Sequence, residues 1–117
     1  LYYALVPPFV LWMTAFLWPR RDHFASLVVM GLMALVAAHT REPRRDLALF
    51  AAGTVMGVFL EYWGTSRECW TYYTRQVPPP VAVVAHGFAA VAFSRAASLV
   101  DGGLRWWSRA RQPLASE

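Results

Sequence analysis

Four long apolar runs constrain the fold of this chain more than any other feature. They cover residues 1–18, 24–40, 47–63 and 81–100, and short breaks that carry Arg separate them. A helix needs about 17 to 25 apolar residues to cross a bilayer, whereas a soluble helix of similar length shows only an apolar stripe. The runs therefore predict an all-α polytopic membrane protein with four transmembrane helices in a small antiparallel bundle.

The composition agrees with this prediction, because 57% of the 117 residues are hydrophobic and 15% are charged. That length allows one compact domain. We expect residues 1–103 to form the transmembrane domain and residues 104–117 to form an interfacial or cytoplasmic tail. A soluble helical domain is the alternative, since some runs lie at the short end of the membrane range.

The basic residues flank the apolar runs, which indicates a role in topology and in contacts with anionic headgroups, not nucleic-acid binding. All eleven are Arg, which together with the many Ala residues is typical of a GC-rich bacterial genome. In a four-span chain the second loop and the tail share one side, and the positive-inside rule predicts that this side is cytoplasmic. We therefore expect a multi-pass protein of the bacterial inner membrane with cytoplasmic termini. The arginines of that side are Arg41, Arg44, Arg45, Arg105, Arg109 and Arg111.

The two ends of the chain carry further signals. Pro7 and Pro8 lack backbone N–H donors and predict that the first helix proper starts near Pro8. Leu1 opens directly into apolar sequence, without the basic segment of a secretory signal peptide, and we expect residues before it in the complete protein.

The tail follows Gly102 and Gly103 and places paired tryptophans among arginines. Such a segment suits the membrane surface, with rings at headgroup level and cations on phosphates. The predicted interfacial anchors are Arg105, Trp106, Trp107 and Arg109.

Gly53 and Gly57 predict a helix-packing face, because their four-residue spacing lets two membrane helices approach closely. Either an internal seam or a contact with another protein would use it. The short break before this run predicts that the second and third helices pack as antiparallel neighbours.

Glu61 is the only acid inside an apolar run, and a carboxylate within a membrane is a functional candidate by default. Two interpretations are open: an interfacial anchor near the helix end, or a group that handles a proton or a ligand. Aromatic residues at and after the end of this run are candidate contacts for a ligand or pigment. They are Trp63, Trp70, Tyr72 and Tyr73.

His86 lies about 8 Å into the last run at 1.5 Å per residue, and a neutral imidazole can bind a metal centre. Ala82 and His86 have the Ala-x-x-x-His spacing and in this resemble light-harvesting polypeptides, which implies a bacteriochlorophyll contact. A hydrogen bond between helices is the alternative. Arg95, in the same run, either reaches toward a headgroup or pairs with a neighbouring helix.

A second local resemblance starts at Glu61-Tyr-Trp-Gly-Thr and continues through Trp70, Tyr72, Tyr73 and the prolines up to Pro80. This block is similar to the Glu-x-x-Gly block of some carotenoid hydratase membrane proteins. The resemblance implies a polyene ligand near Glu61, with the acid protonating a double bond. Those proteins have more spans and further acidic residues, which this chain lacks.

No phosphate loop, zinc-protease helix or serine nucleophile elbow is present in the sequence, and its single cysteine excludes CxxC motifs. We therefore expect no catalytic set and no metal site. The favoured hypothesis is a non-catalytic accessory or assembly subunit of a bioenergetic or photosynthetic membrane complex, in contact with lipids and partner helices. No cofactor is required, although contact with bacteriochlorophyll, carotenoid or quinone fits the aromatic loop. The alternatives are a small membrane enzyme or binding protein that acts on an isoprenoid through Glu61, and a channel or transporter subunit.

Overall fold

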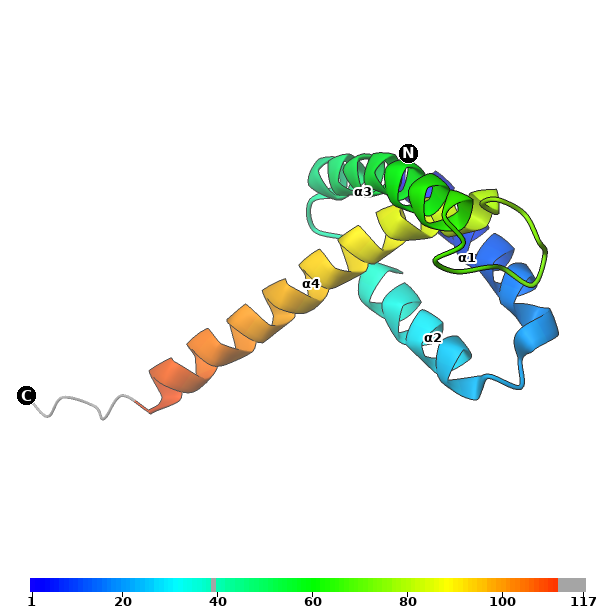
Figure 1. The fold of residues 1–117 in the computed structure, drawn as a ribbon. Helices are drawn as coiled ribbons and strands as arrows, with labels where there is room; N and C mark the ends of the chain where they lie inside the picture. Colours follow the sequence, from blue (N-terminus) through cyan, green and yellow to red (C-terminus); the bar gives the residue numbers. More distant parts are fainter. Residues whose placement is uncertain (39, 112–117) are drawn as a thin grey trace, which may run out of the picture.

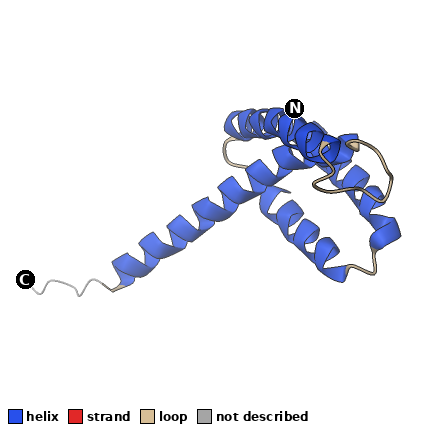
Figure 2. Ribbon diagram, viewed as in Figure 1, coloured by secondary structure: helices blue, strands red, loops and turns tan. Residues whose placement is uncertain are grey.

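A computed structural model describes residues 1–38 and 40–111 of the chain. These residues form four α-helices and one short 3-10 turn, and no strand occurs among them (Figure 2). The prediction of an all-α fold is confirmed. The elements are α1 (Tyr2–Leu17), η1 (Trp18–Arg20), α2 (Phe24–Ala38), α3 (Pro43–Ser66) and α4 (Pro80–Ala110) (Figure 1).

Helix α4 is the centre of the packing, because α1, α2 and α3 all contact it. Within the described part of the chain α2 and α3 do not approach each other, so the prediction that they are packed neighbours is wrong. In Figure 1, α4 runs between α3 on one side and α2 on the other. A short connection brings two helix ends together, but the best-matched surfaces decide which helices pack, and those of α3 and α4 match best.

The seam between α3 and α4 depends on glycine. A Cβ added at Gly57 would lie 2.5 Å from the carbonyl oxygen of Val83, and one added at Gly53 would lie 2.7 Å from that of His86. Both separations are shorter than real Cβ contacts allow, so the backbones touch because these side chains are missing. The glycine face therefore lies inside the molecule, in an antiparallel helix pair.

Helix α1 begins at Tyr2 and continues through Pro7 and Pro8, so the predicted start near Pro8 is wrong. Tertiary contacts hold its first turn. The Tyr2 side chain is buried, and its hydroxyl donates a hydrogen bond of 2.6 Å to the carbonyl oxygen of Ala37. The two prolines remove only two backbone donors, which this packing offsets.

Helix α4 does not end near residue 100, as the predicted span 81–100 required. It continues through Gly102 and Gly103 to Ala110, and residues 112–117 of the predicted tail lie outside the described residues. Each glycine weakens a helix by about 1 kcal/mol relative to Ala, which does not stop a 31-residue helix. The predicted anchors of the tail lie on this exposed continuation: Arg105, Trp106, Trp107 and Arg109.

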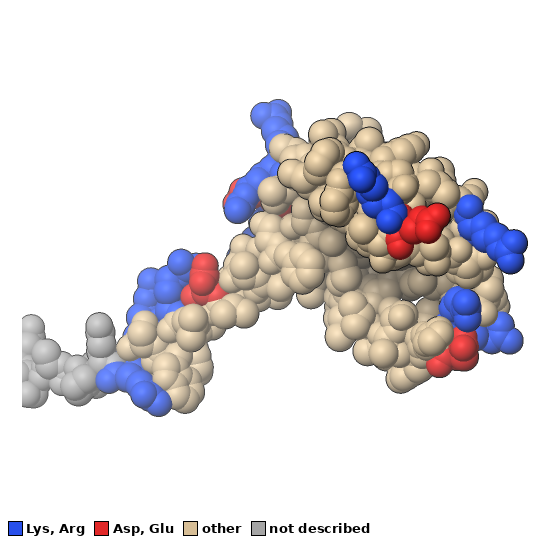
Figure 3. Space-filling view, in the orientation of Figure 1, with Lys and Arg blue, Asp and Glu red and all other residues tan. Residues whose placement is uncertain are grey.

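Two of the helices, α3 and α4, are long and apolar enough to cross a membrane, judged by length and composition. Helix α2 is also apolar but has only 15 residues, and α1 has 16. Charged side chains gather in separate patches, and wide surfaces without charge lie between them (Figure 3). Helix α3, at 43–66, is longer at both ends than the predicted span 47–63.

Candidate functional site

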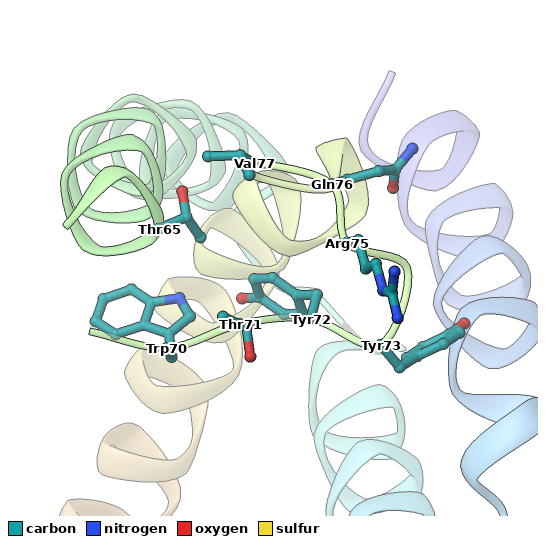
Figure 4. A pocket seen from close by; sticks show the side chains of 8 residues that line it. All are labelled: Thr65, Trp70, Thr71, Tyr72, Tyr73, Arg75, Gln76 and Val77. Atoms are coloured by element: carbon teal, nitrogen blue, oxygen red, sulfur yellow. The ribbon is translucent and has the colours of Figure 1, made fainter. Parts of the chain in front are cut away.

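Glu61 is buried near the end of α3, where its side chain is 5% exposed. Its Oε2 atom accepts a hydrogen bond of 2.8 Å from the Tyr72 hydroxyl and one of 3.2 Å from the indole Nε1 of Trp70. In Figure 4 the phenol oxygen of Tyr72 and the indole nitrogen of Trp70, both on the loop that follows α3, turn toward each other. The loop therefore closes over the carboxylate and supplies two neutral donors.

Gly64 explains the Glu-x-x-Gly spacing in this chain. One turn after Glu61 it faces the six-membered ring of Trp70, and a Cβ at this position would overlap that ring. The missing side chain lets the indole lie flat enough on α3 for its N–H to reach the carboxylate.

His86 approaches Glu61 from α4, with 3.8 Å between its Nε2 atom and Oε1 of the carboxylate. Its Nδ1 atom lies 3.1 Å from the carbonyl oxygen of Ala82. A carbonyl only accepts hydrogen bonds, so Nδ1 carries a hydrogen. Nε2 is then the ring nitrogen that faces the carboxylate, at the distance of an ion-pair contact.

The other side of His86 borders an apolar groove of about 530 Å³ between α1, α2 and α4. Three methionines line it, Met13, Met30 and Met33, together with small residues of α4 such as Ala89. Methionine side chains are flexible and polarisable, and they adapt to irregular apolar ligands. His86 is the one ionisable residue among those that line the groove.

A second cavity, of about 400 Å³, is lined by Thr65 of α3 and by loop residues between Trp70 and Val77 (Figure 4). Tyr72 lines this cavity. Burial, and to a smaller extent the hydrogen bond to Glu61, raise the pKa of its phenol far above 10. Tyr72, Glu61 and His86 thus form a polar row from the loop cavity to the apolar groove. Groups in such a row can hold and pass a proton.

The other predicted contact residues lie outside this row. Trp63 is 52% exposed, and no hydrogen bond of its indole is recorded in the described part of the chain. The Tyr73 hydroxyl donates a hydrogen bond of 2.5 Å to the carbonyl oxygen of Phe16, and the Arg20 guanidinium lies 5.9 Å from the centre of the Tyr73 ring. Tyr73 therefore fastens the loop to the end of α1.

A second buried polar cluster, which the sequence did not predict, lies at the opposite end of the α3–α4 seam. Asp46, 2% exposed, accepts hydrogen bonds from the Arg95 guanidinium, which also donates to the Thr40 hydroxyl. The signal was Arg95 itself, because a cation inside an apolar run needs a partner. Of the two open interpretations for Arg95, the pairing one matches the structure.

The described His, Cys, Asp and Glu side chains do not gather as metal ligands. Across residues 1–38 and 40–111, no three His, Cys, Asp or Glu side chains lie close enough together to hold an ion. Pigment magnesium would need a ring nitrogen of His86, and its two nitrogens face Ala82 and Glu61.

Comparison of this chain with protein families, with curated proteins and with solved structures finds no match. Its function is therefore inferred from the site alone.

Proposed function

We propose that this chain is a small multi-pass membrane protein that binds an isoprenoid-class lipid, a carotenoid or a quinone, in the groove between α1, α2 and α4. The observation that carries the proposal is His86, which lines this groove and has the buried Glu61 carboxylate 3.8 Å from its Nε2 atom. A plain packing gap has no need of an imidazole backed by a buried carboxylate, because burying an ionisable group in an apolar setting is costly.

The chemistry of the groove favours this ligand class. Its lining is apolar and rich in methionine, which suits a long, polarisable, unsaturated chain. Its single ionisable group matches a ligand with few polar atoms. The pair combines a carboxyl group with an imidazole, the two kinds of side chain that protonate a double bond or hydrogen-bond a carbonyl oxygen. The Glu-x-x-Gly resemblance implies the same ligand class.

A groove-filling variant tests binding. Ala89→Trp places an indole inside the groove, and Ala97→Trp, on an exposed part of the same helix, is the matched control. We expect isoprenoid to co-purify with the wild type and with Ala97→Trp in mild detergent, and to be lost from Ala89→Trp. Equal lipid content in all three proteins, measured by mass spectrometry of extracts, would contradict the proposal.

A second variant separates binding from proton transfer. Glu61→Gln keeps an oxygen that accepts hydrogen bonds from Trp70 and Tyr72 but removes the exchangeable proton. We expect it to retain the bound isoprenoid and to abolish any conversion of that lipid. Conversion that persists in Glu61→Gln would show that Glu61 does not transfer the proton.

The exposed continuation of α4 favours the second candidate function, an accessory subunit of a larger membrane complex. From Leu99 onward its apolar side chains have no covering element among the described residues, and Leu104 and Trp106 are 63% and 69% exposed. Such a surface suits partner helices or lipid. Stoichiometric recovery of a pigmented or redox complex would support this role, and substituting Trp106 and Trp107 by Ala should then release the partner.

The proposed topology places the α3–α4 loop outside the cytoplasm and the termini inside. Contacts of Tyr73 with Phe16 and Arg20 support a common side for this loop and the α1–α2 connection. Cys69, exposed in the loop and the only cysteine of the chain, allows a direct test. A membrane-impermeant maleimide should label it in intact spheroplasts. A Cys69→Ala, Ser108→Cys variant should react only after permeabilisation, and the reverse pattern would invert the topology.

A further inference from the structure

A pocket of about 570 Å³ lies at the end of the molecule far from Glu61, between the end of α2 and the middle of α4. One part of its wall is polar and basic, formed by Arg41, Arg95 and Ser98. The other part is apolar, formed by Leu35, Val36 and Leu99. This division of the wall matches a ligand with an anionic head and an apolar chain.

The charges of the pocket leave an excess of one positive charge. Asp46 and the Thr40 hydroxyl hold the Arg95 guanidinium in place, and Asp46 balances its charge. Arg41 is exposed, and no ion pair of its side chain occurs within residues 1–38 and 40–111. A fixed guanidinium beside an unbalanced one is a favourable site for a phosphate group.

The apolar wall distinguishes a lipid from a free phosphate ion. Leu35 and Leu99 are 71% and 67% exposed, although they border a concave site. A phosphate ion would leave both leucines in water, whereas an acyl chain would cover them and gain about 25 cal/mol for each Å² of buried apolar surface. Basic pockets between membrane helices on the cytoplasmic side are also places where anionic headgroups bind.

We propose that this pocket binds an anionic phospholipid, with its phosphate on Arg41, Arg95 and Ser98 and one acyl chain along Leu35 and Leu99. The site is separate from the isoprenoid groove, and it depends on the protein lying in a membrane but not on the identity of the groove's ligand. Bound lipid would bridge α2 and α4 at the level where the membrane surface meets the protein.

The test compares two arginine substitutions with equal change in net charge. Arg41→Gln removes a pocket cation, and Arg44→Gln removes an exposed arginine of α3 that does not line the pocket. The full chain in detergent is titrated with phosphatidylglycerol or phosphatidylcholine, and lipid adducts are counted by native mass spectrometry. We expect Arg41→Gln to weaken phosphatidylglycerol binding about fivefold, the value of one arginine near an anionic surface, and Arg44→Gln to leave it unchanged.

Three outcomes would overturn the proposal: equal weakening by both substitutions, equal binding of phosphatidylcholine, or displacement of the lipid by millimolar inorganic phosphate, which would indicate a site for the free ion. Leu99→Ser provides a second check, since it should weaken lipid binding without changing the charge. Both pocket variants should keep wild-type helicity by circular dichroism. Isoprenoid content should stay at the wild-type level in Arg41→Gln, which separates this site from the groove.

Discussion

Helix α3 carries two buried carboxylates with opposite kinds of partner. Asp46, near its start, faces a permanent cation, Arg95. Glu61, about 22 Å further along the helix axis at 1.5 Å per residue, faces a titratable imidazole and two neutral donors. The first pair joins a carboxylate to a guanidinium, whose charge is permanent, whereas the second joins a carboxylate to an imidazole, the kind of side chain used most often in acid–base chemistry. The comparison indicates that the Asp46 end holds the helices together, and the proposed ligand chemistry belongs to the Glu61 end.

Asp46→Asn should have the largest effect on stability. It leaves the partly buried Arg95 guanidinium without the charge of Asp46, and removing one partner of a buried ion pair costs about 3 to 5 kcal/mol, an upper value for this pair. Unfolding in detergent, followed by circular dichroism, measures the loss. The double variant Asp46→Leu, Arg95→Met is the control and should recover most of it, because a well-packed apolar pair replaces both charges. If Asp46→Asn were as stable as the wild type, the cluster of Asp46, Arg95 and Thr40 would have no structural role.

Gly64→Ala should disrupt the Glu61 end alone. The added methyl group displaces the Trp70 ring, and overpacking of this kind costs about 1 to 3 kcal/mol. Gly31→Ala is the matched control, because nothing lies within 4 Å of its Cβ position. We expect tryptophan fluorescence to change in Gly64→Ala and to stay constant in Gly31→Ala. Identical behaviour of the two variants would show that Trp70 does not cover Glu61.

Glu61→Gln should change stability by no more than about 1 kcal/mol, the net value of a typical hydrogen bond. The amide oxygen still accepts from Tyr72 and Trp70, and its NH₂ group takes the place of Oε1 beside His86. The equivalent change at Asp46 removes the only counter-charge of an arginine, so the two isosteric substitutions should differ several-fold. Equal losses of stability in Glu61→Gln and Asp46→Asn, measured in the same unfolding assay, would contradict the proposed difference in role between the two carboxylates.

Tyr72→Phe should have the smallest effect on stability, and this effect should be visible only in alkaline solution. Burial and the neighbouring Glu61 raise the pKa of its phenol above the ordinary 10.0, so the folded protein binds this proton more tightly than the unfolded chain does. The resulting stability is complete below pH 10 and is lost as the pH rises toward the folded-state pKa. Unfolding free energies between pH 9 and about 11 should therefore fall more steeply for the wild type than for Tyr72→Phe. Parallel curves would show that the phenol is not held by Glu61.

The sequence predicts the helices well, because each apolar run is long and its breaks contain proline or arginine. It predicts the C-terminal end of α4 poorly. Asp101, the two glycines and the arginines after Val100 form a polar pattern that is typical of a loop, whereas a helix already 20 residues long continues through it at small cost. The start of α1 depends on the distant partner of Tyr2, which no local pattern contains.

The candidate site, like the fold, can be predicted from the sequence only in part. Glu61 and His86 stand out singly, because each is polar within an apolar run. Their meeting depends on the glycine seam that sets the register of α3 against α4, and on a loop whose course the sequence does not fix. Asp46 lies at the first turn of α3 among arginines, where an acid is ordinary, so its burial could not be predicted without the position of Arg95.

The central place of α4 has a consequence for biogenesis. This helix is made after the other three, and it supplies the surface on which all of them pack. Until it leaves the ribosome, Gly53 and Gly57 have no partner and Asp46 has no counter-charge. The first three helices therefore lack their common packing surface until α4 is made. We expect a ribosome-stalled chain that lacks α4 to be a substrate for membrane chaperones and quality-control proteases.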